Sequence, residues 1–399
     1  MVFRYRTLKV DIFAEKTNEI FQILKYFSIF VPNSAMTGIY IHIPFCASRC
    51  IYCGFYSTVK RELRQQYADA LCREMAMRTT GDTISTVYLG GGTPSQLTIS
   101  QLQQLFDALY NIYKVADNAE VTIEVNPDDV TAELATELAQ LPVNRVSMGV
   151  QTFDNERLRF LRRRHTSEQA IQAFSRLRKA GFNNISIDLM YGFPDETAAD
   201  WQHDIDAAIA LGAEHVSAYC LSIEEGTPLH RMNIEAADEE TERAMYYTLI
   251  DRLDAAGYEH YEISNFARPG YRSRHNSSYW TDIPYIGLGA AAHSYDGRYR
   301  RWNPSDLQLY VNSIHDGRLT CEQEFIDDVT HYNDRVMLAL RTIEGIDLDT
   351  LTEAERKYLF TNAKKHIDQG LLTRNGQRLR LSREGLFVSD MVMSDLMRA

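Results

Sequence analysis

From residue 38 onward, the chain alternates between short apolar runs and longer segments that carry an apolar residue every three or four positions. The longer segments have the spacing of amphipathic helices; one of them places Leu63, Tyr67, Leu71 and Met75 four residues apart. The short runs are apolar nearly throughout, as strands are when both faces of a sheet are covered. The predicted strands are 38–45, 85–92, 120–127, 145–151, 184–194 and 214–222.

Six strand–helix alternations predict a parallel sheet with helical crossovers, and so an α/β fold. The pattern alone fits a doubly wound sheet as well as a barrel. Within it, Ser100 is predicted to cap one crossover helix and Gly181 to end another. The alternating segment, residues 36–236, is expected to form the main domain.

The pattern changes after residue 237. A long helix is predicted over 238–258, followed by an irregular, aromatic stretch that completes a second segment, residues 237–326. Residues 327–399 are predicted to form a small α+β module, with helices at 333–343 and 353–369. Asn375–Gly376 after them marks a two-residue hairpin turn. Helices followed by a hairpin resemble a winged helix.

The first 35 residues stand outside this pattern. Their apolar run, residues 20–31, is interrupted by Lys25 and is too short to span a bilayer. No small-residue cleavage site follows, so a signal peptide fits poorly. We expect either an amphipathic helix resting on the body or a segment outside the native gene product, with Met36 as a natural start.

Charge and cysteine usage narrow the function further. The formal net charge of −12 gives no general attraction to nucleic acid or to an anionic membrane, so neither partner is expected. A packing or lid role therefore suits the final module better than DNA binding. The six cysteines, three clustered and three scattered, do not form a disulfide framework, which indicates a reducing cytosol.

The clustered cysteines are Cys46, Cys50 and Cys53, in the sequence CASRCIYCGF just beyond the first predicted strand. Ligands bind at this end of parallel strands. Three interpretations fit: a zinc site with His42 or another residue as fourth ligand, a redox pair formed by Cys50 and Cys53, and a [4Fe–4S] cluster with one iron that has no protein ligand.

The spacing C-x-x-x-C-x-x-C within a six-fold β/α alternation resembles the motif of the radical S-adenosylmethionine (SAM) superfamily. That resemblance implies a partial (β/α)6 barrel and a [4Fe–4S] cluster whose open iron binds SAM. A fourth protein thiolate would block this iron. The glycine loop YLGGGTPS, residues 88–95, resembles the loop that holds the methionyl end of SAM.

Five segments in order are similar to oxygen-independent coproporphyrinogen III dehydrogenase and its relatives: YIHIPFC, GGGTPS, IEVNP, SMGVQTF and IDLMYGFP. By this resemblance, SAM contacts fall on Tyr40, Gly91, Gly92, Thr93 and Glu124. Contacts attributed to a second SAM fall on Gln151, Arg163 and Asp188. The resemblance extends from about residue 38 to the C-terminus, with the final module included.

One departure decides the branch of this family. The dehydrogenase pattern continues to a further cysteine where this chain has Phe55. That change, together with HNSSYW at 275–280, resembles the HemW type of relative, described as a haem chaperone. The resemblance places a haem site on His275, Tyr279 and Trp280, of which the histidine can ligate iron. His293 and Cys220 are weaker candidates, and the GLGAAA segment at 287–292 lacks the setting of a dinucleotide site.

The sequence therefore predicts a haem chaperone that carries a SAM-liganded [4Fe–4S] cluster and passes haem to an acceptor protein, for example a respiratory one. The alternative is a radical SAM oxidoreductase that decarboxylates coproporphyrinogen III to protoporphyrinogen IX. The absence of a cysteine at position 55 speaks against this activity. A third possibility, a barrel held together by zinc, does not account for the glycine loop.

Overall fold

A computed structural model describes residues 36–398. The predictions made for residues 1–35 lie outside the described residues. Six parallel strands follow one another in both sequence and space, as the alternation predicted. They are β1 (Met36–Ile43), β2 (Thr83–Gly91), β3 (Lys114–Val125), β4 (Arg145–Gln151), β5 (Ile185–Tyr191) and β6 (His215–Cys220).

The six strands form a partial barrel, because β1 and β6 pair with added strands and not with each other. The sheet order is β12-β11-β10-β9-β1-β2-β3-β4-β5-β6-β8-β7. Strand β9 pairs parallel to β1, and β8 pairs antiparallel to β6. All six parallel strands end at the same edge, which brings the residues after β1, β2, β3 and β4 together.

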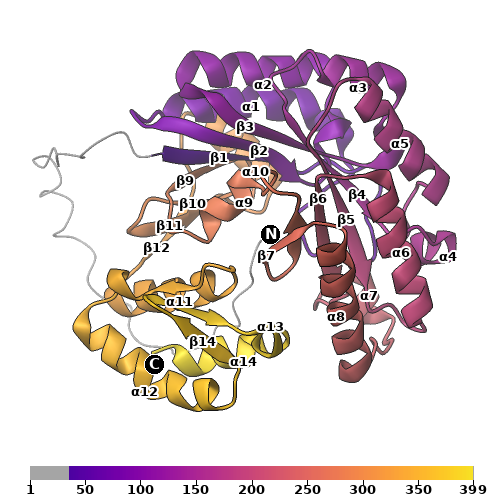
Figure 1. Cartoon of the computed structure of the whole chain (residues 1–399). Helices are drawn as coiled ribbons and strands as arrows, with labels where there is room; N and C mark the ends of the chain where they lie inside the picture. The colour runs from indigo at the N-terminus through magenta and orange to yellow at the C-terminus, as the bar shows by residue number, and fades with distance from the viewer. Residues whose placement is uncertain (1–35, 399) are drawn as a thin grey trace, which may run out of the picture. The chain divides into compact units, whose positions relative to one another are not determined.

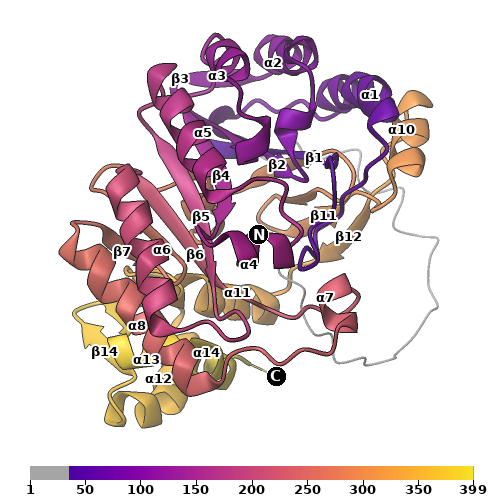
Figure 2. The ribbon, with the colours of Figure 1, turned by 90° about the vertical axis from the view of Figure 1, so that its right-hand side faces the viewer.

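The crossover helices cover the outer side of this curved sheet (Figures 1 and 2). They are α1 (Arg64–Met77), α2 (Ile99–Ile112), α3 (Ala132–Leu138), α5 (Ser167–Lys179) and α6 (Ala198–Leu211). Two further helices are short: α4 (Asn155–Phe160) and α7 (Pro228–Arg231). The long helix α8 (Glu239–Ala255) follows the last parallel strand. The sequence predicted α8 correctly as one long helix.

Threonines, not serines, begin several of these helices. The N-cap of α2 is Thr98, whose side chain accepts from the Gln101 backbone while the Gln101 side chain accepts from Thr98. The predicted cap, Ser100, is the second residue of that helix, so the prediction was two residues late. Gly181 follows α5 with a φ of +105°, as a helix-ending glycine should.

The segment predicted as irregular, residues 258–320, contains short strands that extend both edges of the sheet. Strands of three or four residues are too short to show periodicity, which is why the sequence did not reveal them. They are β7 (Glu259–Glu262), β8 (Asn265–Ala267), β9 (Tyr285–Leu288), β10 (His293–Tyr295) and β11 (Tyr299–Trp302), continued by β12 (Glu322–Phe325). Helices α9 (Arg274–Tyr279) and α10 (Leu307–His315) lie between them.

The C-terminal module has the element order of a winged helix and a hydrophobic core of its own. Its elements are α11 (Asp328–Leu340), β13 (Ile346–Asp347), α12 (Glu353–Asp368), β14 (Leu372–Asn375), β15 (Arg378–Leu381), α13 (Arg383–Phe387) and α14 (Ser389–Leu396). The hairpin turn falls on Gly376 and Gln377, one residue later than predicted, because Asn375 pairs with Arg378. The domain boundaries drawn from the sequence stay predictions. Among residues 36–398, no helix is both long and apolar enough to cross a membrane.

Candidate functional site

The loop that carries the three clustered cysteines leaves β1 at its carboxyl end and is anchored on several sides. The Cys46 N–H donates to the Thr58 carbonyl (2.9 Å), which closes the base of the loop. Ile51, between the second and third cysteines, is buried. Its N–H donates to the Leu161 carbonyl (3.3 Å), and its carbonyl accepts from the Leu229 N–H (2.9 Å). Protein contacts therefore shape the loop independently of any metal.

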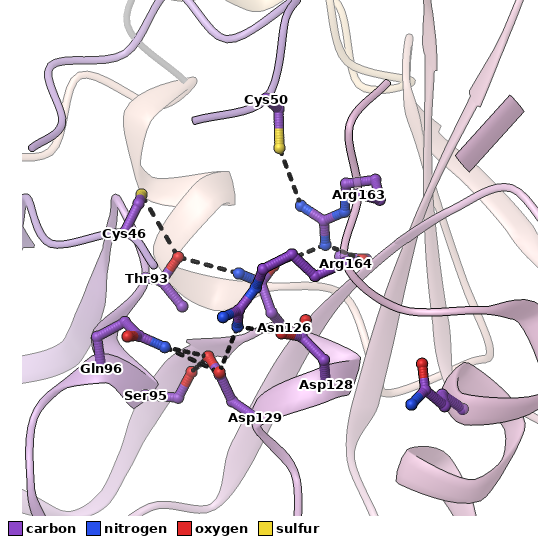
Figure 3. Close-up of polar contacts among 12 residues, drawn as sticks. Cys46, Cys50, Thr93, Ser95, Gln96, Asn126, Asp128, Asp129, Arg163 and Arg164 are labelled. Carbon is purple, nitrogen blue, oxygen red and sulfur yellow. Dashed lines mark hydrogen bonds and ion pairs between the residues drawn. The ribbon is translucent and has the colours of Figure 1, made fainter. Parts of the chain in front are cut away.

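A chain of four hydrogen bonds connects the first two cysteines (Figure 3). The Thr93 hydroxyl donates to Cys46 Sγ (3.6 Å), and the Asn126 amide donates to the Thr93 hydroxyl (3.1 Å). Arg163 Nη2 donates to Asn126 Oδ1 (2.7 Å), while its Nη1 donates to Cys50 Sγ (3.5 Å). Donors therefore point at two cysteine sulfurs, as they do where sulfur carries negative charge.

Burial and hydrogen-bond donors have opposite effects on the pKa of the thiols. It raises the pKa of Cys46, against the Thr93 hydroxyl bond, and raises the pKa of Cys53 to about 11, against a bond from the Phe55 N–H. Position 55 thus supplies a backbone donor to Cys53, and its side chain is 40% exposed. Because metals bind thiolates, loading this loop must release protons.

His42 is not available as a fourth metal ligand. Its Nδ1 lies 3.0 Å from the Tyr40 hydroxyl and its Nε2 lies 2.9 Å from the Tyr56 carbonyl. Within residues 36–398, no three His, Cys, Asp or Glu side chains are grouped to hold one metal ion. Zinc requires its ligands around a single ion, whereas the cysteines of a four-iron cluster bind separate irons. The arrangement favours the cluster over zinc.

The three other cysteines have different surroundings. Cys72 lies on α1 and contacts Gln104 (3.8 Å). Cys220 ends β6 beside Glu242, and burial raises the pKa of its thiol to about 12. Cys321 is exposed. In the described part of the chain, none of them joins the loop cysteines in a metal-binding group.

The glycine loop after β2 packs closely against the protein itself. Gly91 has a φ of +106°, and a Cβ added there would lie 2.3 Å from the His42 ring. A Cβ on Gly92 would lie 2.7 Å from the Pro44 backbone. The sequence suggested that these glycines make room for a ligand, but the fold alone already requires them. A substitution at Gly91 would therefore test packing together with ligand binding.

Acidic and phenolic side chains gather inside the carboxyl end of the barrel. The Glu124 carboxylate accepts from the Gly91 N–H (3.0 Å) and from the Tyr88 hydroxyl (2.8 Å), and the Tyr88 ring lies 6.2 Å from that of Tyr40. Burial raises the pKa of Glu124. Burial, and then the charge of Glu124, raises the pKa of Asp188 to about 7. Tyr40 and Glu124, predicted to contact the first SAM, thus lie near Asp188, predicted to contact a second one, and these ligand roles stay predictions.

Gln151 and Arg163 meet at an irregular end of β4. Gln151 has a φ of +73°, an uncommon conformation for a residue with a side chain, and the pairing with β5 shifts between Gly149 and Gln151. Arg163 Nη2 donates to the Gly149 carbonyl (2.6 Å). Arg163 therefore binds both this strand end and Cys50. From the sequence alone it would have been assigned to a solvated face.

The sequence did not single out Asn126 or Arg145. Asn126 follows β3 directly and joins Thr93 to Arg163, but one polar residue after a strand carries no distinctive pattern. Arg145 begins β4 and is 1% exposed. Its Nε and Nη1 have no hydrogen-bond partner among the described residues, and its charge opposes the pKa rise of Asp188. A charged residue at the start of an otherwise apolar strand was the available signal.

The HNSSYW segment folds as α9 and enters the barrel interior. The Glu120 carboxylate accepts from the Arg274 and His275 N–H groups (2.9 and 2.8 Å). The His275 side chain is fully buried, with Nδ1 2.8 Å from the Thr86 hydroxyl and Nε2 2.9 Å from the Tyr279 hydroxyl. Both ring nitrogens are therefore already engaged.

As a haem ligand, His275 stays a prediction, and one that requires the Tyr279 hydroxyl to move away. Burial lowers the pKa of His275 to about 3, so the ring is neutral. Trp280 faces the opposite direction: its ring lies beneath the Arg341 guanidinium (5.0 Å), which pairs with Glu262 (2.9 Å). In this conformation the segment connects the barrel interior with the C-terminal module.

Comparison with known proteins agrees with this architecture. The Radical SAM superfamily model matches residues 40–208, and the HemN C-terminal domain model matches residues 326–388. Among solved structures, coproporphyrinogen III oxidase (HemN) from Escherichia coli, described as a radical SAM enzyme, superposes with a TM-score of 0.80. It is 22% identical and the match covers 91% of this chain and 90% of that one, a likeness of fold.

Curated relatives are similar over most of their length. The protein named heme chaperone HemW in Bacillus subtilis is 33% identical over 90% of this chain and 98% of its own. That of Mycobacterium tuberculosis is 35% identical, over 90% and 94%. A zebrafish (Danio rerio) protein named radical S-adenosyl methionine domain-containing protein 1, mitochondrial, is 29% identical over 92% and 88%.

Proposed function

The chain belongs to the radical SAM superfamily and, within it, to the HemW family, and on this basis we propose that it is a haem chaperone. It binds haem as cargo, carries a SAM-liganded [4Fe–4S] cluster, and passes haem to an acceptor protein. The observation that carries the cluster is the cysteine loop: three thiols on a scaffold formed by other residues, with donors directed at two of the sulfurs.

The residues present fit these groups. Cys46, Cys50 and Cys53 would hold the cluster, whose chemistry is the supply of one electron at a time. Burial around the loop would exclude water, and the Arg163 and Thr93 donors would stabilise negative charge on sulfur. SAM contacts are proposed for Tyr40, Gly91, Gly92, Thr93 and Glu124, and contacts to a second SAM for Gln151, Arg163 and Asp188.

We expect the affinity for SAM to increase with pH. Asp188 has a pKa of about 7, raised by burial and by Glu124, so its carboxyl gains negative charge as the pH rises through neutrality. SAM carries a permanent positive charge at its sulfonium, so the ionised form binds it better. The ionised fraction rises about tenfold between pH 6 and pH 8, which sets the upper limit of the effect.

Calorimetric titration of SAM into the cluster-loaded protein at several pH values measures this dependence. Asp188→Asn should flatten the profile, because the amide does not titrate. A profile that keeps the wild-type slope in Asp188→Asn would exclude Asp188 as its origin.

Anaerobic haem titration tests the proposed function as a whole. We expect a Soret band that saturates at about one haem per chain. In a parallel incubation with reductant, SAM and coproporphyrinogen III, mass analysis should find no protoporphyrinogen IX, and Phe55→Cys should not create this activity, since one thiol does not make a substrate pocket. Turnover by the unaltered chain would replace the chaperone proposal with the decarboxylation of coproporphyrinogen III.

A further inference from the structure

One histidine differs from the others in its ring contacts. Of the chain's 11 histidines, four have both ring nitrogens hydrogen-bonded: His42, His215, His275 and His331. One ring nitrogen is bonded in His165, His260 and His366, and three histidines lie on the surface: His203, His230 and His315. His293 is partly buried, and its ring stacks on Trp302 without a hydrogen bond to any group within residues 36–398.

His293 lies near the mouth of the barrel. It begins β10, which returns antiparallel from the end of β9, and β9 runs parallel to β1. Gly287 of β9 pairs with Tyr40 on one side. On its other side Gly287 adjoins His293, since a Cβ added to it would lie 1.8 Å from the His293 carbonyl oxygen. No side chain of β9 therefore stands between Tyr40 and His293 at this level.

The His293 side chain points to the inner face of the sheet. Ser294, the next residue, bonds to Arg78 of the outer helix α1 (2.9 Å). Tyr295 has its ring 6.4 Å from that of Tyr285, which in turn contacts the ring of Tyr279 inside the barrel (4.7 Å). Since alternate residues of a strand share a face, His293 shares the inner face with Tyr295.

The surroundings of His293 hold its ring in place and keep it neutral. The Trp302 ring, directly opposite on β11, lies 5.9 Å from the imidazole with an interplanar angle of 26°. Burial, and then the Arg300 charge, lowers the pKa of His293, so the ring is neutral and keeps a lone pair for iron. Arg300 itself pairs with Glu324 (3.4 Å) and with Asp334 (2.7 Å).

We propose that His293 is the axial ligand of the haem iron and that Trp302, stacked on its imidazole, holds that ring in place. This inference rests on the proposed function, since it names the ligand of the haem that the chaperone carries. It places the haem ligand at the barrel mouth, whereas the sequence predicted it in the HNSSYW segment. In the described conformation His293 can bind iron without losing a hydrogen bond, whereas His275 would lose one.

Haemin titrations of the full chain, followed by the Soret band, test this assignment. His293→Ala should lower haem affinity about tenfold or more and shift the band. His293→Gly should behave alike, and added imidazole should restore the wild-type spectrum by entering the space left by the ring. The matched control is His315→Ala, which removes an exposed histidine from α10 and should leave the titration unchanged.

The possible outcomes separate the two proposals. If the unaltered chain binds no haem, the chaperone proposal fails, and the ligand assignment fails with it. If the unaltered chain binds haem and His293→Ala keeps its affinity within about twofold and its Soret position, only the assignment to His293 is overturned. Loss of binding in His293→Gly that imidazole does not restore would also contradict direct ligation.

Discussion

Replacing Cys50 with alanine is expected to abolish the four-iron cluster, and the same result is expected for Cys46→Ala and Cys53→Ala. With three protein ligands and one open iron, the cluster has no spare thiolate to compensate for a loss. In the described residues no other cysteine, histidine or carboxylate completes a metal-binding group with the remaining two. Iron content should fall from about four atoms per chain to nearly none.

Iron analysis and the brown absorbance of anaerobically reconstituted protein measure this effect. Cys72→Ala and Cys321→Ala are the matched controls, because one thiol contacts Gln104 and the other is exposed. Both controls should keep the cluster. If all three loop variants retained about four irons per chain, the cysteine loop would not be the cluster site.

Replacing His275 with alanine is expected to lower the free energy of unfolding by about 3 kcal/mol. The change opens a cavity beneath the Tyr88 ring, which stacks on the imidazole at 5.2 Å. It also leaves the buried Thr86 hydroxyl and the partly buried Tyr279 hydroxyl without their imidazole partner. The large loss follows from the position of His275 inside the barrel, whether or not the protein binds haem.

Denaturant unfolding of the cluster-free protein measures this loss. The control His203→Ala removes an exposed histidine from α6 and should change stability by less than about 0.5 kcal/mol. His293→Ala should also cost little, about 1 kcal/mol or less, because that partly buried ring stacks on Trp302 but makes no hydrogen bond within the described residues. Equal stability of His275→Ala and the unaltered chain would contradict the interior packing described for α9.

The barrel strands were predictable from the sequence because most of their residues are buried on both faces and helices with apolar stripes lie between them. β4, for example, was predicted with its observed bounds, whereas the strand predicted for β5 began one residue early and ended three residues late. The strands of three or four residues that extend both sheet edges carry no periodic signal. They became visible only through their pairing with β1 and β6.

At the candidate site, the cysteine spacing and the glycine loop were visible in the sequence, but the contacts between distant residues were not. Asn126 links Thr93 to Arg163 across two loops, and no local pattern marks that role. The tight packing of Gly91 against His42 likewise depends on the pairing of β1 with β2. Long-range geometry of this kind is what a single sequence leaves open.

The hydrogen-bond chain between Cys46 and Cys50 also bears on how the iron-free loop responds to air. A disulfide requires two sulfurs about 2 Å apart, and each of these sulfurs is instead held by a different partner, Thr93 or Arg163. Burial raises the pKa of Cys46 and Cys53, which keeps their thiols in the form that oxidises slowly. The empty loop should therefore survive oxidants long enough to accept iron, while exposed Cys321 becomes the first site of cross-linking between chains.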